Sequence, residues 1–305
     1  MISRRRILKL GTAAAGAALA TPVTAATSEN NCTALPPSIA SLTSMKDQAK
    51  PITTEERGEQ QEKARRLMAD NKLDAILFTE GTSLTYFSGI HWGGSERLFA
   101  MVLPVKGNVF YVCPAFEEGR AREQIAKAPG AEQADVRIWQ EDGSPYQRVA
   151  QGLNDRGLST GTLGMEETVR FVFSQGIGKA SPQMKIASAT PVTAGCRMIK
   201  SNHEVELMRL AAKVTLTAYE AAYHALNPGM TKPQLEEMVE AAHSRLGFSG
   251  SADAQVGEYS AFPHGSITPQ VIREGAIVLM DGGGNVEGYA SDITRTFVLG
   301  KLPTR

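Results

Sequence analysis

The stretch Leu279–Phe297 reads Leu-Met-Asp-Gly-Gly-Gly-Asn-Val-Glu-Gly-Tyr-Ala-Ser-Asp-Ile-Thr-Arg-Thr-Phe. Two short β-like runs flank a glycine-rich turn, which predicts a hairpin with one aspartate in each strand, Asp281 and Asp292. If the turn centres on Val286–Glu287, the two aspartates lie directly opposite each other on one face. Their Cβ atoms are then roughly 4.5–5.5 Å apart, and the like charges repel.

A cation between the two aspartates would relieve this repulsion. Carboxylates are good ligands for hard divalent ions, and paired metals about 3.5–4 Å apart are a known hydrolytic device. The hairpin alone fits equally well with two aspartates in ordinary turn or edge positions. Other motifs in the sequence distinguish between these two interpretations.

Length and charge narrow the functional classes. A chain of 305 residues predicts two domains with additional segments. Lysine plus arginine and aspartate plus glutamate each number 32, so the formal net charge is zero. No long basic block occurs outside the N-terminus, which argues against nucleic acid as a partner.

The first residues have the layout of an export signal. Ser3–Lys9 contains adjacent arginines, Leu10–Ala20 is a mildly apolar run rich in glycine and alanine, and Val23–Ala25 offers small residues for cleavage. We expect a twin-arginine signal over residues 1–26, with a general secretory signal as the alternative. Both place the mature protein in the bacterial periplasm or outside the cell. The apolar run is too short for a membrane anchor, and residues 27–54 are expected to form a flexible arm.

The cysteines give no metal pattern. Cys32, Cys113 and Cys196 are odd in number and far apart, and they match no zinc-binding spacing. One disulfide is compatible with an oxidising compartment, and buried free thiols are equally compatible.

Residues 55–196 alternate between helical and strand-like segments, which predicts an α/β domain with a mixed sheet. The polar and aromatic stretch Gly89–Arg97 contains His91 and is expected to be a surface loop, with a contribution to a neighbouring subunit's active site as the alternative. Helices are expected over Glu55–Asn71, Phe116–Lys127 and Tyr146–Arg156, and strands over Ala75–Phe78, Phe99–Leu103, Val109–Val112, Val136–Trp139 and Thr162–Met165.

The remaining chain opens with two predicted helices. Ser201–Glu204 has the pattern of a capping box, and helical spacing continues to Leu226, where Asn227-Pro228-Gly229 ends it. A second helix is expected over Thr231–Gly247. Pro263-His264-Gly265 differs, because it lies in a non-helical stretch that can hold an imidazole rigidly over a neighbouring site. Three further histidines are expected to be solvated or packing residues rather than ligands: His203, His224 and His243.

Three features in this order resemble the creatinase and Xaa-Pro peptidase family, the M24 metallopeptidases that include prolidase and aminopeptidase P. They are Arg197–Met208, Pro263–Gly265, and the aspartate hairpin that ends in Ser291–Phe297. The resemblance implies both α/β and α+β architecture. A creatinase-like N-terminal mixed-sheet domain over residues 55–196 would precede the first part of a pita-bread catalytic domain over residues 197–305.

The resemblance also implies roles for individual residues. Asp281 would be a bidentate ligand of one metal and Asp292 would bridge two divalent ions, with manganese, cobalt, zinc and iron all suitable. His264 would contact the substrate and steady the tetrahedral intermediate, and Thr294 would support the site from the same strand face as Asp292. The implied activity is hydrolysis of a proline-containing peptide by metal-activated water, in a protein that could form a homodimer.

This sequence departs from the family at its end. The family completes its site with a later histidine and two glutamates, whereas this sequence stops at Arg305. We therefore expect an incomplete site, weak or absent metal binding and no peptidase activity from these residues alone. Three alternatives remain: a metal-dependent lyase acting on a small substrate such as dimethylsulfoniopropionate, a metal-free creatinase-like hydrolase, which both aspartates argue against, and a non-catalytic binding module.

Overall fold

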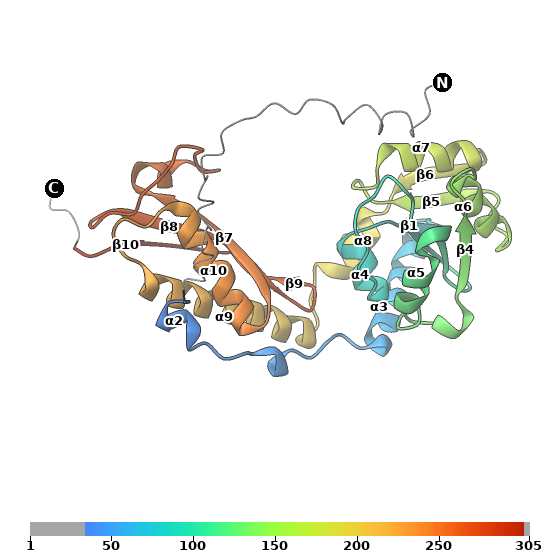
Figure 1. Ribbon diagram of the computed structural model, residues 1–305. Coiled ribbons are helices and arrows are strands. Elements are labelled where there is room, and N and C mark those ends of the chain that lie inside the picture. Colours follow the sequence, from blue (N-terminus) through green and yellow to red (C-terminus); the bar gives the residue numbers. More distant parts are fainter. Residues whose placement is uncertain (1–33, 302–305) are drawn as a thin grey trace, which may run out of the picture. The chain divides into compact units, whose positions relative to one another are not determined.

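The computed structural model describes residues 34–301. The predicted export signal and Cys32 lie outside this range. Within it, an N-terminal α/β domain precedes a second domain built from two long helices and an antiparallel sheet (Figure 1).

The N-terminal domain contains a six-stranded mixed sheet in the order β4-β3-β2-β1-β5-β6. Strands β1, β2 and β3 pair antiparallel, whereas β4, β5 and β6 join as parallel strands. The strands are β1 Ala75–Phe78, β2 Ala100–Pro104, β3 Phe110–Pro114, β4 Asp135–Trp139, β5 Gly161–Met165 and β6 Met184–Ser188. The predicted mixed sheet is confirmed.

Helices cover both faces of this sheet, since the central strands are buried along their whole length. One face, with Ile76 and Phe78, packs against α3 Thr54–Asp70, α4 Thr82–Ser88, α5 Glu118–Ile125 and α8 Thr190–Arg197. The other face, with Ala75 and Leu77, packs against α6 Pro145–Asn154 and α7 Phe171–Ala180. Short 3-10 turns complete the connections at η2 Ala115–Glu117 and η3 Ala131–Gln133.

The second domain places α9 Asn202–Ala225 and α10 Lys232–Leu246 against one face of a small sheet (Figure 1). Its strands are β7 Ser249–Val256, β8 Ile277–Val286, β9 Tyr289–Ala290 and β10 Ile293–Val298, in the order β10-β8-β7 with β9 also paired to β8. The 3-10 turn η4 Gly257–Ala261 follows β7.

Both long helices begin at a capping box, α9 where the Ser201–Glu204 pattern predicts one and α10 directly after Thr231, the predicted start of the second helix. Ser201 accepts a hydrogen bond from the Glu204 amide, and the Glu204 carboxylate accepts one from the Ser201 amide. Thr231 and Gln234 form the same reciprocal pair at the start of α10. Each such cap contributes about 1 kcal/mol to helix stability, and the two caps fix where the supporting helices enter the domain.

Residues 36–54 do not form the flexible arm expected from their polar composition. They contain α2 Pro37–Ala40 and η1 Lys46–Gln48, and the fully buried Ile39 joins the core formed by α9 and α10. The Ser38 hydroxyl donates to the Ala221 carbonyl at 2.8 Å. A few apolar side chains spaced among polar ones are therefore sufficient to fix this segment on the second domain.

Over residues 34–301, no helix combines the length and the apolar character needed to cross a bilayer.

Candidate active site

The aspartate hairpin turns one position later than the sequence pattern suggested, which moves each pairing partner by two residues. Val286 pairs with Tyr289, so the tight turn consists of Glu287 and Gly288, both with positive φ, 51° and 87°. This is the backbone of the favoured two-residue hairpin turn, with glycine at its second position. The Asn285 side chain accepts a hydrogen bond from the Gly288 amide at 2.9 Å, which closes the turn further.

The prediction that Asp281 lies directly opposite Asp292 is therefore wrong. Asp281 pairs with Thr294, and Gly282 pairs with Ile293. Because the shift is two residues and side chains alternate with period two, Asp292 stays on the same face as Asp281 as a diagonal neighbour. Diagonal neighbours have Cα atoms about 7–8 Å apart, which long or polar side chains can bridge.

This shared face points away from the helices. Val278, Met280 and Val286 of β8 are buried against α9 and α10, whereas Asp281 and Asp292 are exposed. The Thr294 hydroxyl donates a hydrogen bond to Oδ1 of Asp281. Thr294 thus contacts one of the two candidate metal ligands directly, as a residue that orients a ligand must.

A third carboxylate lies on the same face but is neutralised. Asp253 of β7 pairs with Asp281 in the ladder, and its Oδ1 accepts a hydrogen bond from the Lys232 ammonium at 2.5 Å. Hydrogen bonds from Lys232 and Gln255 lower the pKa of Asp253 against the raising effect of its partial burial. Sequence analysis missed β7, although Ala252, Ala254 and Val256 alternate with polar residues along it.

His264 follows η4 in a loop and has an exposed imidazole. Gln255, which is buried, holds this loop against β7: its Oε1 accepts from the Ser266 amide at 3.3 Å and from the Gln270 side chain at 3.0 Å. Gly265 has a φ of 70°, which favours glycine, and a Cβ there would lie 2.1 Å from the amide nitrogen of the buried Gln255 side chain. The His264 loop is thereby fixed beside Asp253, the residue across from Asp281.

The two exposed aspartates suit a hard divalent cation. Within residues 34–301, neither Asp281 nor Asp292 has a salt-bridge partner. Burial, together with these two carboxylates, raises the pKa of Tyr219 to about 12, and its hydroxyl is buried without a partner in the described part of the chain. Arg295 opposes the two carboxylates, but each of them acts on Tyr219 more strongly than Arg295 does. The local field is therefore negative, and the donor chemistry fits a metal.

The described residues supply only part of a metal site. Among them, no group of three or more histidine, cysteine, aspartate or glutamate side chains is arranged to hold an ion. The structure brings Asp281, Asp292 and Thr294 together on one sheet face and places His264 on an adjoining loop. The ligand roles of these residues stay predictions.

A buried histidine lies behind the hairpin. His243 of α10 is fully buried, and its Nδ1 lies 2.9 Å from the Val239 carbonyl oxygen. Its Nε2 lies 3.2 Å from the Thr215 hydroxyl of α9, which in turn lies 2.8 Å from the Ser291 hydroxyl. His243 is therefore a packing residue with both ring nitrogens hydrogen-bonded, in line with its expected structural role.

Acidification is expected to destabilise the protein through His243. Burial lowers the pKa of His243 below its usual value of 6.5, so the unfolded chain binds more protons than the folded one as pH falls through 6.5. The contribution of neutral His243 to the free energy of unfolding is fully present above pH 6.5. About 1 kcal/mol of this contribution should be lost between about pH 7.5 and 5.5. Urea unfolding at both pH values measures this loss.

The matched comparison for this prediction is His243→Gln, which cannot titrate. His203 stays in both proteins; its hydrogen bond to Glu56 raises the pKa of His203 and acts in the opposite direction. Between about pH 7.5 and 5.5, the free energy of unfolding should change by about 1 kcal/mol less in His243→Gln than in the wild type. Equal pH dependence in the two proteins would contradict the prediction.

The other histidines and the cysteines lie away from the aspartates. His91 is exposed in its predicted loop, and His224 is exposed on α9. His203 contacts Glu56 with Nδ1 and the Lys50 carbonyl with Nε2, at 2.8 and 2.9 Å. Cys113 and Cys196 are buried free thiols.

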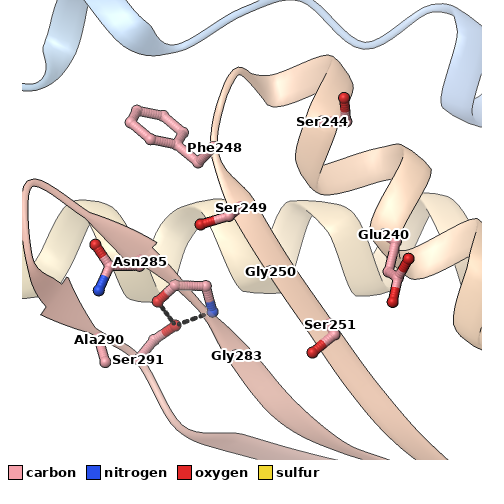
Figure 2. Close-up of a pocket in the computed structure, with 11 residues that line it drawn as sticks. Glu240, Ser244, Phe248, Ser249, Gly250, Ser251, Gly283, Asn285, Ala290 and Ser291 are labelled. Atoms are coloured by element: carbon pink, nitrogen blue, oxygen red, sulfur yellow. Dashed lines mark hydrogen bonds between the residues drawn. The ribbon is translucent and has the colours of Figure 1, made fainter. Parts of the chain in front are cut away.

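An open pocket adjoins the hairpin near its turn. It is lined by the end of α10, the start of β7, the β8 glycines and the Ala290–Ser291 segment (Figure 2). The aspartates do not line this pocket. Figure 2 shows the Ser291 hydroxyl against the backbone of the neighbouring strand, where it accepts a hydrogen bond from the Gly284 amide at 3.0 Å.

Comparison with known proteins matches both domains. Residues 60–199 match the Creatinase/Prolidase N-terminal domain, and residues 206–305 match Metallopeptidase family M24. An uncharacterized peptidase of Schizosaccharomyces pombe is 31% identical over 274 residues, which are 85% of this chain and 58% of that protein. The Xaa-Pro dipeptidase of Lactobacillus delbrueckii subsp. lactis is 23% identical over 79% of this chain and 65% of its own length.

A solved structure shows the same fold. The crystal structure of dipeptidase PepE from Mycobacterium ulcerans superposes with a TM-score of 0.74 and 26% identity, covering 83% of this chain and 67% of that chain. The chain thus spans about three fifths of the length of the curated relatives it matches, 58% for the first of them. With its creatinase-like N-terminal domain followed by the start of an M24 domain, the chain belongs to the creatinase/prolidase branch of the M24 metallopeptidase family.

Proposed function

We propose that this chain belongs to a metal-dependent dipeptidase or aminopeptidase that hydrolyses the peptide bond preceding proline. The observation that carries the proposal is the pair Asp281 and Asp292, exposed on one sheet face without cationic partners in the described range. Relatives named as dipeptidases and as an Xaa-Pro dipeptidase support the substrate class. A creatinase-like hydrolase without metal is disfavoured because it would have no use for both carboxylates.

Asp281 and Asp292 would hold two divalent ions, which when bound polarise a carbonyl oxygen and generate a nucleophile from water at neutral pH. Thr294 orients Asp281 through its hydrogen bond to Oδ1. Each carboxylate oxygen has two lone pairs, so this bond leaves Asp281 free to bind a cation as well. Thr294 therefore fixes the direction of the carboxylate without blocking it.

His264 would bind and orient the substrate. Its loop is fixed to β7 through Gln255 and Gln270, and the imidazole is exposed. The next residue, Gly265, lies close to Asp253 on the face that carries the aspartates. A hydrogen-bond donor held in this way can stabilise negative charge that develops on a substrate oxygen.

Metal analysis and substrate comparison on the protein at its natural length test the proposal. We expect bound divalent metal, and manganese-stimulated hydrolysis of Gly-Pro that a chelator abolishes. Cleavage of dimethylsulfoniopropionate in place of Gly-Pro would assign the site to a lyase instead. A protein that binds no metal and turns over neither substrate would overturn the proposal and leave a binding module.

We also propose export of the protein through the twin-arginine route, on the basis of the Ser3–Lys9 sequence and the apolar run that follows it. Exchange of Arg4 and Arg5 for lysine should then retain the protein in the cytoplasmic fraction of a bacterial host. Unchanged export of this variant would favour the general secretory alternative.

A further inference from the structure

The Asp292 segment is attached to the two long helices by polar groups in the interior. Thr215 of α9 and His243 of α10 are both fully buried, and Ser291, which directly precedes Asp292, is partly buried. Buried polar groups are costly unless hydrogen-bonded. These three side chains are hydrogen-bonded in sequence, and the last of them directly precedes the candidate metal ligand Asp292. Ordinary core packing does not account for such an arrangement.

The hydrogen bonds of this row can be assigned in order, starting from His243. The Val239 carbonyl oxygen can only accept a hydrogen bond. Nδ1 of His243 is therefore protonated and donates to this oxygen over 2.9 Å. Burial lowers the pKa of His243, so the ring is neutral and Nε2 is an acceptor. The Thr215 hydroxyl therefore donates to Nε2 over 3.2 Å.

The assignment continues to the sheet. Since the Thr215 proton is directed at His243, its oxygen accepts the Ser291 proton over 2.8 Å. The Ser291 oxygen then accepts from the Gly284 amide at 3.0 Å, while the Ser291 amide donates to the Gly284 carbonyl at 2.9 Å. The Ser291 hydroxyl also lies 3.3 Å from the Gly284 carbonyl oxygen, but its contact with the Thr215 oxygen is the shorter of the two. The row therefore connects α10 and α9 to the segment that follows β9 through consecutive hydrogen bonds.

Close packing removes the space for any alternative arrangement. A Cβ at Gly250 would lie 2.2 Å from the His243 ring, and a Cβ at Gly284 would lie 3.0 Å from it. The imidazole thus fills the gap left by two glycines on neighbouring strands, β7 and β8. It holds both strands at a fixed distance from α10.

We propose that the buried row His243–Thr215–Ser291 positions Asp292 against Asp281 for metal binding, so that these three are positioning residues of the site. The register itself leaves Asp292 only a diagonal neighbour of Asp281, and the strand pairing is interrupted between β9 and β10, at residues 291 and 292. The side chain of Ser291 supplies an anchor at this interruption. The proposal rests on the proposed function for its metal, but its geometric part can be tested without metal.

The first test is amide hydrogen exchange on the metal-free protein at its natural length. Thr215→Val keeps the shape of the side chain but removes the hydroxyl, and Ser291→Ala removes the other end of the row. In both variants, peptides that cover residues 284–294 should exchange on the order of tenfold faster, while β7 peptides keep their rate. Thr215→Ser retains the hydroxyl and should restore the original rate. Unchanged exchange in Thr215→Val and Ser291→Ala would overturn the proposal.

The second test is manganese titration by calorimetry of the same proteins. Residues that orient a ligand typically affect metal affinity about 10–100-fold, so the dissociation constant should rise by that factor in Thr215→Val and Ser291→Ala. Ile272→Val, which removes one methylene from the fully buried core of the same domain, is the control for general loss of stability and should leave the constant unchanged. If Ile272→Val weakened manganese binding by the same factor, the row would be ordinary core structure without a specific positioning role.

The two tests separate this proposal from the proposed function. Metal binding by the wild type with unchanged affinity in both hydroxyl variants would refute the positioning role and leave the peptidase assignment intact. A wild type that binds no manganese would refute the metallopeptidase assignment and with it the metal-positioning role, even where exchange confirms that the row anchors residues 291 and 292.

Discussion

Asp292→Asn and Asp281→Asn are each expected to lower kcat/KM for Gly-Pro by on the order of a thousandfold in the protein at its natural length, because metal ions supply several kcal/mol of transition-state stabilisation. Asparagine keeps the shape of aspartate but cannot carry the negative charge that holds a divalent cation. The measurement is steady-state hydrolysis together with metal content. Full activity in either variant would exclude that residue as a ligand.

The same variants should have the opposite effect on stability in the absence of metal. Asp281 and Asp292 are like charges on one sheet face, so removal of one charge should raise the free energy of unfolding by about 0.5 kcal/mol. Asp253→Asn is the matched comparison on the same face. Asp253 is paired with Lys232, and its replacement should lower stability instead. Destabilisation by Asp281→Asn in metal-free protein would point to a structural role for the aspartate.

The face of the hairpin could be predicted from the sequence, but the register could not. Period-two alternation fixes which residues share a face, and a shift of two positions leaves this unchanged. For that reason Asp281 and Asp292 are on one face despite the wrong pairing. The turn needs two residues with positive φ, and the placement of Gly288 at the second turn position was the local signal that would have located it.

Other parts of the site depend on contacts between distant segments. Lys232 lies 21 residues from Asp253, and Gln270 lies 15 residues from Gln255. Only the fold shows that Lys232 neutralises this carboxylate and that the two glutamines fix the His264 loop. His243 was correctly expected to be a packing residue, but nothing in its local sequence indicates a link to Ser291. Helix and strand positions were predictable where periodicity and caps agreed, as in α9, whereas the burial of Ile39 required the tertiary structure.

Gly283→Ala is expected to destabilise the second domain by about 3 kcal/mol, near the upper end for steric overpacking. A Cβ at this position would lie 1.8 Å from the Ser291 carbonyl oxygen and 2.6 Å from its carbon, both of them backbone atoms that cannot rotate away. Gly283 does not have a positive φ, so the requirement is for space alone. Relief of the clash would have to separate β8 from the segment that carries Asp292.

The position of the tryptophans shows which domain is destabilised by Gly283→Ala. Both tryptophans, Trp92 and Trp139, lie in the N-terminal domain, so their fluorescence reports on that domain, whereas circular dichroism reports on both. Gly283→Ala should shift the urea transition followed by circular dichroism more than the one followed by fluorescence. Gly58→Ala is the control: it lies inside α3 with no atom within 4 Å of the added Cβ, and it should stabilise by about 0.5–1 kcal/mol.

The metal affinity of Gly283→Ala at temperatures where it remains folded links this prediction to the site. The clash acts on the carbonyl of Ser291, the residue next to Asp292. It should therefore also disturb the hydrogen bond from Ser291 to the buried row His243–Thr215–Ser291. We therefore expect weaker manganese binding in the folded variant as well as lower stability. A variant that is destabilised yet binds manganese as tightly as the wild type would show that the hairpin can separate at Gly283 without displacing Asp292, and that strand pairing at this point serves the fold alone.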